Sequence, residues 1–459
     1  MRTSIFCVAV CVALAAPLAA HAEDPSRPGD TDTEDAEDTE DAEDAEDAEA
    51  RSGTGRWSTL AEEVAALQDA APVGNPTTAA PAIPQEEWKV YWKDALTIEG
   101  PDTTIKIGGR TMIDFAGFSG DDFEAATGIG LDDGTEFRRA RLYVLGTIHG
   151  NIDFKAQYEF ATGIGDTAFA DVYIRFQDLY GLKVGHFKEP MGLEQLTSSR
   201  YITFMERTLG SNALTPSRNM GMQVMHPFSA ARRGTWAVGL FRDTNAFAKD
   251  TGDGDLALTG RLTYLPYSNA DDSQLVHLGA ALSLRDADDD LELFASRPEA
   301  HLLPPFFGTG LFAANSTDLF GLEAAWVDGP FSLQTEYFGG STDTDVGDAE
   351  QSAYYLQASY FLTGEHRTYK RSAGAFGRVT PTRDFAKGAG GGAWELAVRL
   401  SHLELEDAGS TSDEQDNWTL GLNWHLNRST RIMWNYVRAE LDSVDEHVDM
   451  LMMRFQIEF

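Results

Sequence analysis

Apolar and polar residues alternate along most of the chain from about Thr104 to its end. In the last strand-like stretch, Asp449 to Phe459, apolar side chains occupy every second position and most of the others are charged or amide residues. Alternation with period two predicts a β-strand with one apolar face and one polar face. A chain that stops on an aromatic residue in this pattern is typical of an outer-membrane β-barrel.

The same alternation predicts sixteen strands, and bacterial barrels have even numbers of strands. Many of these segments begin or end in Trp or Tyr, which favour the two membrane interfaces. A soluble sandwich also alternates but rarely needs so many strands in one domain. We therefore predict an all-β fold, a transmembrane antiparallel β-barrel of sixteen strands, for residues 88–459.

Composition excludes a bundle of membrane-spanning helices, because 24% of the residues are charged and only the amino terminus approaches helix-spanning apolarity. Residues 1–22 have an early arginine, an apolar core and the ending Ala20-His21-Ala22, which predicts a cleaved signal peptide. Both cysteines, Cys7 and Cys11, fall inside it. The exported chain is therefore expected to have no disulfide.

Two further segments precede the predicted barrel. Residues 23–55 are predicted to be a disordered acidic tract, because positions 23–50 carry fifteen carboxylates and one arginine. The tract is either a solvated spacer or a tether that attracts cations or a basic partner. Residues 56–87 are predicted to be a short amphipathic helix followed by a Pro-rich linker.

Connections of unequal length predict the topology, because short turns of such barrels face the periplasm and long loops face outside. Gly150-Asn151 and Gly329-Pro330 are tight turns, whereas residues 286–317 and 363–391 are long and are expected outside. The longest early piece without alternation is 188–218, after the fifth strand. We predict that this third loop folds inward and narrows the channel.

Several motifs resemble the phosphate-selective porin O and P family. Residues 184–194 read VGHFKEPMGLE, and further matching pieces occur in the family's order: Ile107-Gly108-Gly109-Arg110, Phe137-Arg138-Arg139-Ala140, Leu362-Thr363-Gly364-Glu365 and Gly392-Ala393-Trp394-Glu395-Leu396. The resemblance covers roughly residues 88–459. It implies a trimer of sixteen-stranded barrels in which arginines and lysines conduct anions such as phosphate or polyphosphate.

Two interpretations of the wall arginines remain open. Arg110, Arg139, Arg141 and Arg175 are placed on the lumen face by alternation, where they form either a basic ladder or ion pairs with facing carboxylates. Guanidinium groups match phosphate geometry. The candidate pore or anion-contact residues are Arg110, Arg139, Arg141, Arg175, Lys183, Lys188, Gln195, Arg200, Arg207 and Arg218.

Phosphate specificity is expected to be weak. Family members that bind phosphate tightly have a lysine directly after Gly-Leu-Glu in the third loop, and Gln195 stands there in this chain. The predicted function is passive diffusion of small solutes, above all anions. The alternatives are a weakly selective general porin and a structural barrel that tethers cell wall or a surface layer.

Other chemistry has little support in the sequence. The ten histidines have no paired spacing for a metal, and no Gly-x-Ser-x-Gly motif is present. We therefore expect no enzymatic activity, no metal and no cofactor. The expected partners are outer-membrane lipid, small anionic solutes and two further copies in a homotrimer, with no nucleic acid, in a Gram-negative outer membrane.

Overall fold

The computed structural model describes residues 88–161, 168–229, 231–251, 256–345, 347–385, 390–406 and 413–459. The predicted signal peptide (1–22), acidic tract (23–55) and helix with linker (56–87) lie outside these described residues. Among the described helices, none is long and apolar enough to cross a membrane.

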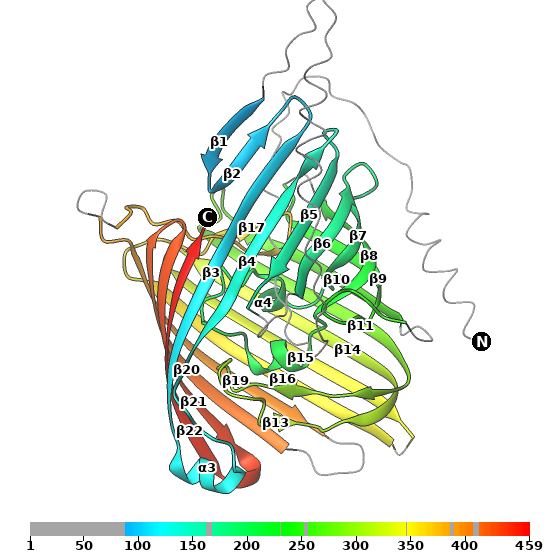
Figure 1. Ribbon diagram of the computed structural model, residues 1–459, viewed down its shortest axis with the longest axis vertical. Coiled ribbons are helices and arrows are strands. Elements are labelled where there is room, and N and C mark those ends of the chain that lie inside the picture. Colours follow the sequence, from blue (N-terminus) through cyan, green and yellow to red (C-terminus); the bar gives the residue numbers. More distant parts are fainter. Residues whose placement is uncertain are drawn as a thin grey trace, which may run out of the picture. The chain divides into compact units, whose positions relative to one another are not determined.

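Sixteen antiparallel strands form a closed ring, as the alternation predicted (Figure 1). The last strand pairs with the first over Asp449↔Ser119 to Glu458↔Arg110, which closes the barrel. The strands are β3 (Thr104–Ser119), β4 (Gly134–Ile148), β5 (Ile152–Glu159), β6 (Ala168–Phe176), β7 (Leu182–Lys188), β8 (Arg218–Phe228), β9 (Gly234–Arg242), β10 (Leu256–Ser268), β11 (Gln274–Glu292), β14 (Phe312–Asp328), β15 (Phe331–Thr344), β16 (Gly347–Phe361), β19 (Ala393–Leu405), β20 (Asp413–Asn427), β21 (Thr430–Leu441) and β22 (Glu446–Glu458).

Closure of the ring explains the two adjacent glycines of β3. The backbone N–H of Gly109 donates to the Phe459 carbonyl at 2.6 Å, and Phe459 returns a hydrogen bond to Gly109 at 3.0 Å. A Cβ atom at Gly108 would collide with the Tyr143 ring and the Phe459 carbonyl. The chain terminus can therefore approach β3 because side chains are absent at this point.

A hairpin that the alternation did not predict precedes the barrel. Strand β1 (Lys89–Lys93) pairs with β2 (Ala95–Glu99), and β2 pairs with the start of β3. This hairpin extends the sheet at the end of β3 where the chain enters the barrel (Figure 1).

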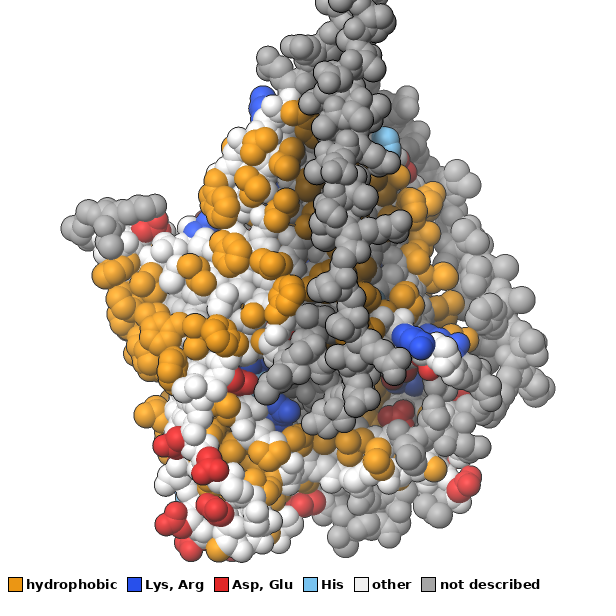
Figure 2. All heavy atoms as spheres, viewed as in Figure 1, with side chains coloured by type: hydrophobic (Ala, Val, Ile, Leu, Met, Phe, Trp, Pro, Cys, Tyr) orange, Lys and Arg blue, Asp and Glu red, His pale blue; other side chains and the backbone are white. Residues whose placement is uncertain are grey.

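The two faces of the wall differ as predicted. Leu142, Phe320 and Leu400 are exposed on the outer face, whereas the neighbouring Arg141 and Arg399 are buried inside. Hydrophobic side chains cover much of the outer wall, and acidic side chains gather at the end that carries helix α3 (Asp121–Thr127) (Figure 2). An apolar outer band of this kind matches a lipid environment.

One long connection lies at the end opposite to the one predicted. Strands alternate in direction, so the tight turns at 149–151, 329–330 and 428–429 mark one end of the barrel, here named the turn end. The connection 362–392 joins β16 to β19 at this end. The expectation that it faces outside was therefore wrong. We name it the turn-end loop; it contains β17 (Tyr369–Lys370) and β18 (Ala375–Phe376).

The opposite end, named the loop end, carries α3 and two segments that matter for the lumen. The L3 segment (residues 189–217) joins β7 to β8 and contains helices α4 (Leu193–Leu196) and α5 (Leu209–Ala213). The L5 segment (residues 293–311) joins β11 to β14 and contains β12 (Ala295–Ser296) and β13 (Phe307–Gly308).

Candidate functional site

The L3 segment folds into the barrel, as predicted from its lack of alternation. It reaches strands on the far side of the ring: the N–H of Leu209 donates to the Ser401 hydroxyl at 3.2 Å, and the Asn423 side-chain amide donates to the Thr203 carbonyl at 2.7 Å. Nearly all of its side chains are buried. The lumen is therefore narrowed by an ordered segment.

A wall carboxylate positions the start of α4. Glu336 on β15 accepts hydrogen bonds from the backbone N–H groups of Leu193 at 2.5 Å and Glu194 at 2.8 Å. The Tyr355 hydroxyl donates to the same carboxylate at 2.5 Å. Helix α4 has no side-chain cap of its own, so Glu336 supplies the acceptors that its first N–H groups require.

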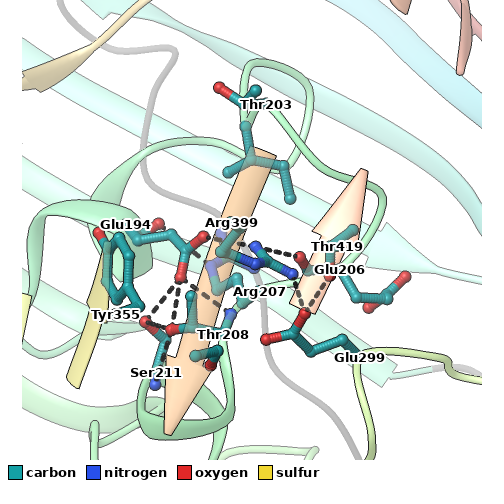
Figure 3. A network of polar contacts seen from close by, with 12 residues as sticks. Glu194, Thr203, Glu206, Arg207, Thr208, Ser211, Glu299, Tyr355, Arg399 and Thr419 are labelled. Carbon is teal, nitrogen blue, oxygen red and sulfur yellow. Dashed lines mark hydrogen bonds and ion pairs between the residues drawn. The ribbon is translucent and has the colours of Figure 1, made fainter. Parts of the chain in front are cut away.

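A second cluster joins L3 to L5 through one arginine of the wall (Figure 3). Arg399 on β19 donates to Glu194 at 3.3 Å, to the Glu206 carbonyl at 3.0 Å and to Glu299 of L5 at 2.5 Å. Thr208 and Ser211 donate to the other oxygen of Glu194, both at 2.8 Å. We name Glu194, Glu299 and Arg399 the Arg399 cluster.

The turn-end loop meets L3 inside the barrel. The Phe376 N–H donates to the Thr197 hydroxyl at 3.4 Å, and Arg378 donates to the Tyr201 hydroxyl at 3.2 Å. Leu193 of L3 also packs in one apolar cluster with Tyr369 and Phe376. Two segments that enter from opposite ends thus meet inside the barrel.

A cleft beside this meeting point is rich in arginine. We name it the arginine cleft; its charged lining is Arg200, Arg367, Arg378, Arg428 and Arg431 with Glu395 and Glu458. Asp94 also contacts Arg428 and Arg378, at 2.8 and 3.5 Å, so five guanidinium groups face three carboxylates and positive charge remains in excess. A passing anion would meet fixed donors there in a partly water-excluded space.

Two of these arginines have neutral partners. Arg367 donates to the side-chain oxygen of Gln334 at 2.7 Å, and Arg431 donates to the Ile202 carbonyl at 2.8 Å and to Gln456 at 3.1 Å. Within the described residues, neither forms an ion pair with a carboxylate. Burial lowers the pKa of Arg367 to about 10, which still leaves it protonated at neutral pH.

The other arginines of the cleft are ion-paired. Arg378 and Arg200 share Glu458 at 2.7 and 3.5 Å, and Arg428 pairs with Asp94 at 2.8 Å. Although burial opposes the charge of Arg378, the neighbouring Tyr201 and Glu458 raise its pKa.

The predicted wall arginines all point into the lumen, and Arg139, Arg141 and Arg175 contact carboxylates there. Arg139 and Arg141 share Glu159 at 3.6 and 2.6 Å, and Arg175 pairs with Asp153 at 2.6 Å. Arg110 lies opposite Arg141 in the strand register and is buried. The wall therefore contains ion pairs in which two cations share one carboxylate. Contact of these arginines with anions stays a prediction.

The predicted residues at the entrance to L3 contact neighbouring side chains and the loop backbone. Lys188 donates to the Gln195 carbonyl at 2.5 Å, and Arg218 pairs with Asp171 at 2.6 Å. Lys183 lies over the Phe187 ring at 4.0 Å. Arg207 donates to the Thr197 carbonyl at 2.8 Å and so braces the loop backbone.

The sequence did not identify Arg138, Arg367, Arg378, Arg428 or Arg431 as site residues. Arg138 faces the lumen because a bulge opposite Met112/Ile113 puts two consecutive arginines inside, where it pairs with Glu206 at 2.8 Å. Arg367 and Arg378 belong to the loop that was predicted at the other end. The excess of basic residues in 363–390 is the sequence feature that could have indicated Arg367 and Arg378 as site residues.

A closed antiparallel barrel with an apolar outer band and a lumen narrowed by an inward-folded loop is a porin of the outer membrane. The sequence profile of the phosphate-selective porin O and P family matches residues 105–459. Porin O of Pseudomonas aeruginosa (strain PAO1) is 28% identical over 408 residues, which cover 78% of this chain and 88% of that protein.

An uncharacterized protein of Caulobacter vibrioides is also 28% identical, over 398 residues that cover 81% of this chain and 76% of that protein. Among solved structures, the trimer form of in-vitro folded OmpT, an outer membrane protein of Vibrio cholerae, superposes with a TM-score of 0.51 at 10% identity and covers 78% of this chain and 99% of that one. This last likeness concerns the fold.

The chain belongs to the phosphate-selective porin O and P family. It is an outer-membrane channel of a Gram-negative bacterium.

Proposed function

We propose that the chain is a homotrimeric porin through which small anions, phosphate among them, diffuse passively, and that it catalyses no reaction and uses no cofactor. The arginine cleft is the observation that carries this proposal. Its five guanidinium groups face three carboxylates, Asp94 included, at the place where L3 and the turn-end loop meet. An anion gains more from such a site than a cation does.

Basic side chains on the wall support the same selectivity. Arg139 and Arg141 contact Glu159 at 3.6 and 2.6 Å, and Arg218 and Lys155 contact Asp171 at 2.6 and 3.0 Å. Guanidinium and ammonium groups of this kind are the donors that an anion would meet along β4 to β8.

The proposed selectivity is weak for phosphate in particular. The side chain at position 195 is an amide and adds no charge to the centre of L3, while the nearby Lys188 ammonium is already engaged by the Gln195 carbonyl. Lipid on the outer wall and two further copies of the chain are the proposed partners. The trimer form of the Vibrio cholerae protein supports this assembly.

The test is single-channel recording of purified protein in a planar bilayer, with the reversal potential measured in a salt gradient. Arg367→Gln removes one cleft charge whose described partner is neutral, so the anion-to-cation permeability ratio should fall. Arg371→Gln is the matched control. Arg371 lies in the same loop but pairs with Asp272 at 2.5 Å outside the cleft.

Anion preference that falls in the Arg367→Gln variant and is kept in the control would support the proposal. Cation preference of the native protein would contradict anion transport and leave a general porin. No current at all would favour the structural barrel.

A further inference from the structure

A polar patch interrupts the outer wall where β19 and β20 approach the loop end. His402 lies directly opposite Asp416 in the register of these strands, on the face that also carries Leu400 and Leu420. Nδ1 of His402 is 2.9 Å from Oδ1 of Asp416. With Glu414, these residues bring three ligand atoms within 4.8 Å of one another.

The strand register gathers negative charge around this histidine. Glu404 lies directly opposite Glu414, and Asp416 lies between His402 on one side and Glu440 on the other. Like charges directly opposite each other destabilise a sheet. A bound cation would reduce the repulsion within both pairs, Glu404 with Glu414 and Asp416 with Glu440.

We propose that His402, Glu414 and Asp416 bind a divalent transition-metal ion of the zinc class on the outer wall. Imidazole and carboxylate together suit zinc, whereas magnesium and calcium prefer oxygen ligands alone. Ligand atoms around a tetrahedral zinc ion lie roughly 3.4 Å apart, so small rotations of these partly exposed side chains complete the site.

Neighbouring groups set the orientation of the His402 ring and show where the site lies along the barrel wall. The Tyr354 ring stacks on the His402 ring with centroids 4.8 Å apart and an interplanar angle of 28°. The lipid-facing residues Leu400 and Leu420 lie on the same face, farther from the loop end. The ion would join β19 to β20 at the polar edge of the apolar band and keep a coordination position open to the outside.

A second histidine on the outer wall provides a matched control. His447 on β22 lies 3.9 Å from Asp449. Asp449, however, already accepts two hydrogen bonds from Arg438 at 2.7 and 2.8 Å, so its charge is balanced. Glu440 lies directly opposite His447 in the register of β21 and β22. Because Asp449 is already paired, this control resembles the proposed site in composition but has less unbalanced negative charge.

The test counts zinc retained by the purified full-length chain after incubation with Zn²⁺ and gel filtration, together with a titration by calorimetry. One tight site per chain is expected in the native protein. The His402→Gln and Asp416→Asn variants should bind at least about tenfold more weakly, because changes even outside the ligand set weaken metal sites by that factor. The acidic residues 23–50 add the same background to every variant.

The His447→Gln variant should keep the native affinity. Equal retention of zinc by the native protein and the His402→Gln variant would overturn the proposal, and so would loss of zinc in the His447→Gln variant. Tight binding of Ca²⁺ that His402→Gln leaves unchanged would also overturn it, because the site would then be a carboxylate site without the histidine.

Discussion

The L3 segment and the turn-end loop enter the barrel from opposite ends, yet they are held by different kinds of contact. Wall side chains form hydrogen bonds with the backbone of L3. Glu336 accepts hydrogen bonds from two of its N–H groups. Arg431 donates to the Ile202 carbonyl, and Arg454 donates to the Met205 carbonyl. The turn-end loop instead extends its own arginines to the wall.

Three arginines of the turn-end loop make these contacts. Arg367 reaches Gln334, Arg378 reaches Glu458, and Arg371 reaches Asp272. Arg261 adds a contact of the other kind, from the wall to the Gly374 carbonyl at 2.8 Å. L3 is therefore positioned through its backbone as well as through ion pairs such as Glu206 with Arg138, whereas the turn-end loop is anchored mainly by its own arginines, which are also the charges proposed to act on passing ions.

Shortening the turn-end loop should have the largest effect. Replacing residues 366–380 with a short Gly-Ser linker removes one of the two segments at the constriction together with three arginines. Single-channel conductance should rise severalfold and anion preference should fall. The double variant Arg367→Gln/Arg378→Gln separates the two causes, because it should lower anion preference with a much smaller rise in conductance. Unchanged conductance after shortening would show that L3 alone limits the current.

Breaking the Arg399 cluster should mainly affect stability. Arg399→Ala leaves the buried carboxylates of Glu194 and Glu299 without their guanidinium partner, at a cost of about 3 to 5 kcal/mol in unfolding free energy. Denaturant unfolding would measure this loss, and current noise should increase as L3 loosens. Arg438→Ala on the outer wall is the control, since its partly exposed pair with Asp449 is expected to contribute about 0 to 1 kcal/mol.

Replacing the Glu336 carboxyl group with an amide should have a smaller effect on the same loop. Glu336→Gln keeps the shape of the side chain but replaces one acceptor oxygen with a donor that faces the α4 N–H groups. A loss of about 1 to 3 kcal/mol is expected from denaturant unfolding. Conductance should change as well, because Glu336 positions the α4 backbone inside the lumen.

The lipid-facing side of the barrel could be predicted because each strand needs an apolar residue at every second position. This rule correctly assigned Arg141 to the lumen and Leu142 to the lipid face. It failed at Arg138, where one extra residue in β4 shifts the alternation. The apolar and polar pattern of a sequence does not show where such a bulge occurs. Loop length was the weaker guide, since the strand count alone assigns 362–392 to the turn end.

The candidate site was only partly predictable for a different reason. Lys188, Arg200 and Arg207 belong to a segment whose position after the fifth strand indicated the lumen. The partners of Arg399 are 205 and 100 residues away in sequence, so only the closed ring brings Glu194 and Glu299 to it. Long-range pairs of this kind carry no local signal.

A positive charge added to L3 should give the smallest of these effects. It tests whether the side chains of L3, like those of the turn-end loop, act on passing anions. Gln195→Lys adds a cation to the loop that relies on the wall for its position, where Glu194, Arg207 and the wall contacts keep the backbone in place. Phosphate should then block the chloride current at lower concentration, with conductance in chloride alone nearly unchanged. Titration of single-channel current with phosphate would measure the shift, and Ser199→Lys is a control at another buried L3 position. Block that is unchanged in Gln195→Lys would mean that passing anions do not reach the centre of L3 and that the arginine cleft sets selectivity alone.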